Sequence, residues 1–94
     1  MHFGLLTLQF KLFGCNSLKE KRSMLRPLEH RLSKQFNFSI AETGYQDSHE
    51  DAQITLGLVN NNSAYIQSEF ANIEKWMEKN YPELTIYDQK LEII

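Results

Sequence analysis

The sequence predicts a small α/β domain of the α+β type, with four strands and two helices in the order βαββαβ. Four stretches alternate apolar and polar residues with a period of two, which is typical of strands. Two further stretches carry apolar residues at the i, i+3 and i+4 spacing of amphipathic helices. Two right-handed βαβ crossovers place the first and third strands at the centre of the sheet. The pattern is ferredoxin-like: a four-stranded antiparallel sheet with two helices on one face.

The first predicted elements are a strand over residues 3–12, a turn over residues 13–16 and a helix from Ser17 to about Phe36. Ser17 and Glu20 have the spacing of a capping box, in which each side chain accepts a backbone N–H of the first turn. The residues on the apolar face of this helix are Leu18, Met24, Leu25, Leu28, Leu32 and Phe36.

Pro27 interrupts the helical pattern, because proline removes one backbone hydrogen bond inside a helix. It lies nearly opposite the apolar face, so we expect its ring to face solvent. A kink between Ser23 and Pro27, convex towards solvent, would wrap the helix onto the sheet.

The second half of the chain predicts a strand from Asn37 to about Tyr45, a hairpin loop over residues 46–50 and a third strand. Apolar residues in the third strand alternate over residues 52–58. The predicted core combines residues from the strands and helices: Leu6, Leu8, Phe10, Leu25, Leu28, Leu32, Ile54, Leu56, Leu58, Ile66, Phe70, Ile73 and Met77.

Residues 60–63 offer several helix caps, and Pro82 ends the second helix, which we expect to stop near Asn80. The last strand runs from Leu84 to about Ile93. Its apolar residues change parity midway, which predicts a β-bulge near residues 87–89.

The charge of the chain is strongly segregated. Residues 1–35 hold seven basic and two acidic residues, a balance of +5, whereas residues 36–94 hold three and ten, a balance of −7. The first turn of the first helix is basic, although a helix N-terminus favours carboxylates. This mismatch suggests an anion-binding face, with the backbone of RNA as the natural ligand. The proposed contact residues are Lys19, Lys21, Arg22, Arg26 and Lys34.

Two other readings of the basic residues remain open. They could form a solvated helix surface, or they could pair with Asp47, Glu50 and Asp51. The second alternative follows from the topology, which brings the start of the first helix, the hairpin loop and the end of the second helix to one end of the molecule. RNA binding would rest on charge, because the central strands lack the aromatic motif of RNA-recognition domains.

A second candidate surface involves Tyr65 and Trp76, which lie off the apolar stripe of the second helix. They either pack at the edge of the core or belong to a protein interface, where Tyr and Trp are enriched. The uncovered sheet face, with Phe3, Leu5 and Val59, is another dimer surface to consider. Two functional hypotheses follow: an RNA- or ribosome-associated binding module, and a homodimeric interaction module that binds no nucleic acid.

No pattern of catalytic or metal-ligating residues stands out, so we expect a non-enzymatic protein without cofactor or metal. Cys15 has no motif around it, and the three histidines have no paired spacing. The single cysteine excludes an internal disulfide, which favours a reducing cytoplasm. The sequence contains no membrane-spanning apolar run and no clear signal peptide, and its length predicts one domain.

A resemblance to a known family rests on four segments: Met1-His2-Phe3-Gly4, Ser17-Leu18-Lys19-Glu20-Lys21-Arg22, Ala41-Glu42 and Gln46-Asp47. Together these resemble the YlxP-like family of small bacterial proteins of unknown function, over essentially the whole chain. The resemblance implies a ferredoxin-like fold and supplies no catalytic residues. Genes of this family often neighbour genes for translation and ribosome maturation, so it also implies a ribosomal partner, either RNA or protein. Phe13, where the family often has proline, and Pro27 depart from the family pattern.

Overall fold

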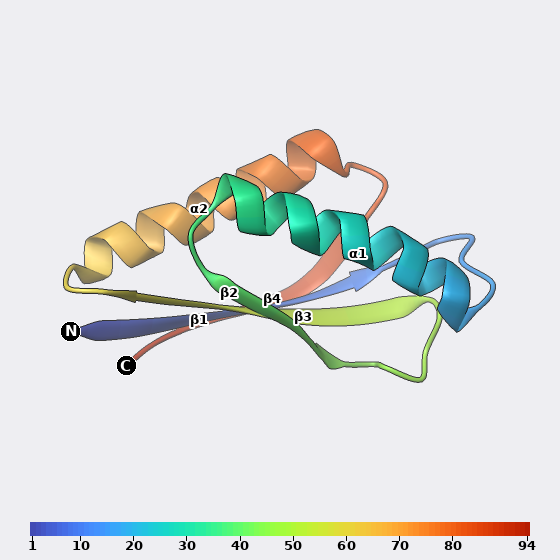
Figure 1. Cartoon of the computed structure of the whole chain (residues 1–94), viewed down its shortest axis with the longest axis horizontal. Helices are drawn as coiled ribbons and strands as arrows, with labels where there is room; N and C mark the ends of the chain where they lie inside the picture. Colours follow the sequence, from blue (N-terminus) through green and yellow to red (C-terminus); the bar gives the residue numbers. More distant parts are fainter.

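The predicted element order is confirmed by a computed structural model that describes all 94 residues. The elements are β1 (His2–Lys11), α1 (Leu18–Gln35), β2 (Ser39–Gly44), β3 (Asp51–Asn60), α2 (Ser63–Asn80) and β4 (Thr85–Ile93). The strands form one antiparallel sheet in the order β2-β3-β1-β4, so β1 and β3 are central as expected. Both helices lie on the same face of the sheet and leave the other face open (Figure 1). Neither helix is long and apolar enough to cross a membrane.

The core lies between the sheet and the two helices. All thirteen predicted core residues are buried, and four others join them: Leu12, Cys15, Ala52 and Leu84. Gly4 allows α2 to approach β1 closely, because a Cβ atom at this position would overlap Ile66 and Phe70. Close approach of a helix to a strand is one of the few reasons for glycine inside a strand.

The start of α1 is capped nearly as predicted. The Ser17 hydroxyl accepts a hydrogen bond from the Glu20 N–H (3.1 Å). The Glu20 carboxylate accepts from the N–H of Asn16 (2.8 Å), one residue before Ser17, whose N–H is the donor in a capping box. Pro27 is exposed, as expected, and α1 continues through it as one helix.

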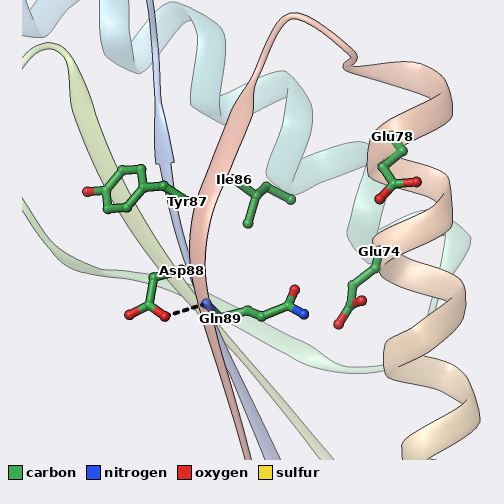
Figure 2. Close-up of a pocket in the computed structure, with 6 residues that line it drawn as sticks. All are labelled: Glu74, Glu78, Ile86, Tyr87, Asp88 and Gln89. Atoms are coloured by element: carbon green, nitrogen blue, oxygen red, sulfur yellow. Dashed lines mark hydrogen bonds between the residues drawn. The ribbon is translucent and has the colours of Figure 1, made fainter.

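The bulge predicted near residues 87–89 is confirmed at Tyr87. Phe10 pairs with Ile86 and Gln9 with Asp88, so Tyr87 is the additional residue in β4. In Figure 2, Ile86 points towards α2 while Tyr87 and the residue after it point to the opposite side of the strand. A second, unpredicted bulge lies in the other edge strand, where Thr43 has no partner in β3.

Candidate functional site

The outer face of α1 carries a row of exposed cations. Lys19, Arg22, Arg26 and Lys34 are all exposed, and none has a carboxylate within 4.0 Å. On a helix with a rise of about 1.5 Å per residue, the row spans about 22 Å, and His30 lies along it. We call these four residues the α1 basic row. Its four positive charges face solvent without an ion-pair partner.

Lys21 does not belong to this row, so its proposed contact with RNA was wrong. Its side chain is only 3% exposed, and its ammonium group donates to the carbonyl oxygens of Tyr45 (2.6 Å) and Ser48 (2.7 Å). Glu42 lies 3.8 Å from the same ammonium group. Because its two hydrogen-bond acceptors are carbonyl oxygens of the β2–β3 loop, Lys21 fastens this loop to α1.

None of the three acidic residues considered as partners of the basic row, Asp47, Glu50 and Asp51, forms an ion pair with it. Asp51 forms an ion pair with Lys11 (2.9 Å) and accepts a hydrogen bond from the Tyr87 hydroxyl (3.1 Å). The hydrogen bond from Lys11 lowers the pKa of the Asp51 carboxyl and raises that of the Lys11 ammonium group. Asp47 and Arg22 line the same hollow of about 300 Å³, but no ion pair joins them.

The end of α2 contacts α1 well beyond its basic first turn, and Lys79 near that end of α2 forms no ion pair. Arg31 makes this contact instead: its guanidinium group donates to the Tyr81 hydroxyl (3.1 Å) and the Asn80 side chain (3.4 Å). It also lies 5.2 Å from the ring centre of Trp76. The guanidinium group of Arg31 is therefore engaged in packing the two helices together.

Tyr65 and Trp76 have different surroundings. Trp76 is half-buried and packs against Phe36 and Tyr81, with ring centres 6.4 and 5.8 Å apart. This is the edge-of-core position that the sequence left as one alternative. Tyr65 is 44% exposed in the first turn of α2.

A groove between α2 and β4 was not predicted from the sequence. It encloses about 360 Å³, and Glu74 and Glu78 of α2 face Gln89 of β4 across it (Figure 2). The groove has one wall from α2 and one from β4, and the bulge at Tyr87 determines which β4 side chains face α2. The spacing of Glu74 and Glu78 along α2 describes only the first wall, so it could not predict the groove.

The remaining reactive side chains are dispersed. Cys15 is 2% exposed, and its thiol lies 3.5 Å from the carbonyl oxygen of Ser17. His49 contacts the carbonyl oxygen of Cys15 through Nδ1 (2.7 Å) rather than the thiol. No three His, Cys, Asp or Glu side chains are grouped so as to hold a metal ion.

Comparison with known proteins gives a family. Residues 3–91 match the model of a family described as "Protein of unknown function (DUF503)". The chain belongs to this family. It is also 29% identical over 73 residues to the uncharacterized protein YlxP of Bacillus subtilis (strain 168), an alignment that covers 78% of each chain. The expected YlxP-like membership is confirmed, and neither description names a ligand or a reaction.

Proposed function

We propose that this chain is a non-enzymatic binding module whose α1 basic row contacts the phosphate backbone of structured RNA. The observation that carries the proposal is that four cations without an ion-pair partner lie along one exposed face of α1. Lys11, Lys21 and Lys90 each have a carboxylate within 4.0 Å, and the other unpaired cations, Arg31, Lys75 and Lys79, do not form a comparable row. Unpaired cations on one helix face are suited to a polyanion.

The surroundings of the row favour backbone contacts over base stacking. The exposed side chains between its cations include Ser23, His30 and Ser33, and no Phe, Tyr or Trp lies within α1. Proteins that bind unpaired bases usually stack them on aromatic side chains. A row of cations in which His30 is the only aromatic ring suits the regular phosphates of a folded RNA. Ribosomal RNA is the first candidate, because genes of the family that this chain resembles often neighbour genes for ribosome maturation.

The test is RNA binding as a function of salt. Filter binding to a folded ribosomal RNA fragment should show that affinity falls as salt rises, with a log–log slope of about −0.9 per phosphate contact on a duplex. Four contacts predict a loss of about 100-fold between about 50 and 200 mM salt. Replacing Lys19 and Arg22 together by glutamine should weaken binding and make the slope shallower by about two units.

The matched control replaces Lys75 and Lys79 on α2 by glutamine, which removes the same charge from another exposed surface. This variant should bind RNA as the parent does. The double variant of the basic row should also melt at the parent's temperature, because no ion pair is lost. Absence of RNA binding by the parent at about 50 mM salt, or equal weakening by both variants, would refute the proposal.

A further inference from the structure

The two central strands carry almost no charge on the open face of the sheet. The sequence has no Asp, Glu, Lys or Arg in residues 1–10, 35–41 and 52–68, which include nearly all of β1 and β3. Glu42 of β2 lies beside Lys21 under α1. The charged residues on the open side are the Lys11–Asp51 pair at one end and three residues of the edge strand β4: Asp88, Lys90 and Glu92, of which the last two form an ion pair. Depletion of charge marks the centre of protein interfaces.

The polar side chains in the middle of this face bind one another. The hydroxyl groups of Thr7 and Thr43 lie 3.2 and 2.8 Å from that of Thr55. The Gln53 amide accepts from Gln9 (2.7 Å) and donates to Thr43 (3.0 Å). Because these bonds persist when water is removed, covering this surface costs less than covering charged or unpaired groups.

The other end of the open face is apolar and hollow. Phe3 is 38% exposed and Val59 52% exposed. Both line a hollow of about 440 Å³ together with Phe38 and Gly57, which has no side chain to fill it. The exposed Val59 side chain and the hollow therefore lie within the same patch. A twofold contact needs such a patch, because the same surface of both copies must supply the projecting group and the recess that receives it.

We propose that a second copy of this chain covers the open face, sheet against sheet, with the Val59 side chain of each copy in the hollow of the other. Charge selects this occupant. Nucleic acid would find no free cation among the central strands, because Lys11 is paired with Asp51. A face with uncharged central strands and both signs of charge along its edge does not repel its own copy as two α1 basic rows would.

Pairing through strand edges is disfavoured by the same structure. Both edge strands contain a β-bulge, at Thr43 in β2 and at Tyr87 in β4. Such irregularities interrupt the row of free backbone groups that a second sheet would need. With both sheet edges interrupted, we expect two copies to associate through the open face.

Sedimentation equilibrium over about 5 to 500 µM tests the proposal. The parent should self-associate, and Val59→Asp and Val59→Lys should each raise the dissociation constant at least about tenfold, because like charges then meet across the twofold axis. An equimolar mixture of the two variants should associate again. Phe13→Asp is the matched control: Phe13 is 72% exposed in the β1–α1 turn, and this variant should behave as the parent.

A change in association can be distinguished from a loss of folding, because Val59 is half exposed and neither variant disturbs the core. A parent that remains monomeric at about 500 µM overturns the proposal. Val59 variants that associate as tightly as the parent, or a mixture that does not associate, overturn it as well, since either result places the contact elsewhere.

Discussion

Replacing Lys21 by methionine should destabilise the protein more than any other removal of a basic side chain from α1. Methionine keeps most of the aliphatic length of lysine but has no ammonium group. The carbonyl oxygens of Tyr45 and Ser48 would lose their donor, and Glu42 would lose its nearby positive charge.

The magnitude follows from these three contacts. Removing one partner of a buried, hydrogen-bonded charge typically costs about 3–5 kcal/mol. Two features reduce this value: the Glu42 side chain is 30% exposed, and the loop carbonyls can turn towards water. Tyr45 also has a φ of 56°, a left-handed conformation whose strain can relax once the loop is released. We therefore expect a loss of about 2–4 kcal/mol, out of a total of about 5–14 kcal/mol for 94 residues.

Urea denaturation of the parent, Lys21→Met and Lys19→Met measures this loss. Lys19 is exposed on the same helical turn and has no ion pair, so its variant should stay within about 0.5 kcal/mol of the parent. Hydrogen exchange should also show faster exchange at the N–H of Ser48, which bonds to Tyr45 within the loop. Equal stabilities of the two variants would refute the fastening role of Lys21.

Three further predictions concern single positions. Pro27→Ala should stabilise the protein by up to about 3 kcal/mol in a urea melt, because Pro27 is exposed and its ring removes a helix hydrogen bond; a loss would mean that the ring packs against the fold. Gly4→Ala should cost about 1–3 kcal/mol because its Cβ overlaps Ile66, whereas Gly57→Ala meets only ordinary contacts and should be nearly neutral. Burial raises the pKa of the Glu29 carboxyl above its ordinary 4.5, so its ionisation opposes folding as pH rises through the folded-state pKa. Glu29→Gln should therefore raise the melting temperature at pH about 7 but not at pH about 3, and the reverse order would contradict it.

The fold could be predicted because its strongest signals are periodic. Ile54, Leu56 and Leu58 alternate in β3, and the helical spacing of Ile66 and Phe70 places them on the core face of α2. A change of parity in β4 was also enough to locate the bulge, because one additional residue keeps both apolar sets on the core side.

The site was predicted less well at Lys21, which was included among the contact residues for its charge without regard to its helical phase. Lys21 lies three residues after Leu18 and four before Leu25, which is the spacing of the apolar stripe of α1. That position could have indicated a buried lysine. The acceptors that make its burial tolerable could not have been predicted, because two of them are backbone carbonyls of a loop whose conformation the sequence does not specify.

The pairing of Asp51 shows the same limit. The topology correctly brings the β2–β3 loop to the start of α1, where Lys21 bonds to it. Nevertheless, Asp51 is the first residue of β3, directly opposite Lys11 in β1, and this register decides its partner. The topology predicts the end of the molecule at which Asp51 lies. Its ion-pair partner can be predicted only from the register between β1 and β3.

The two proposed surfaces lie on opposite sides of the sheet, with α1 on the covered side and the dimer face on the open side (Figure 1). Two copies joined through their open faces would therefore carry their basic rows on opposite outer sides. With sheets about 10 Å apart and a helix layer on each, the rows would be separated by the full thickness of the dimer. One straight RNA duplex could not lie along both rows, so each copy would bind RNA independently. Association and RNA binding can then be tested one at a time: Val59→Asp alters only the first, and the loss of Lys19 and Arg22 alters only the second.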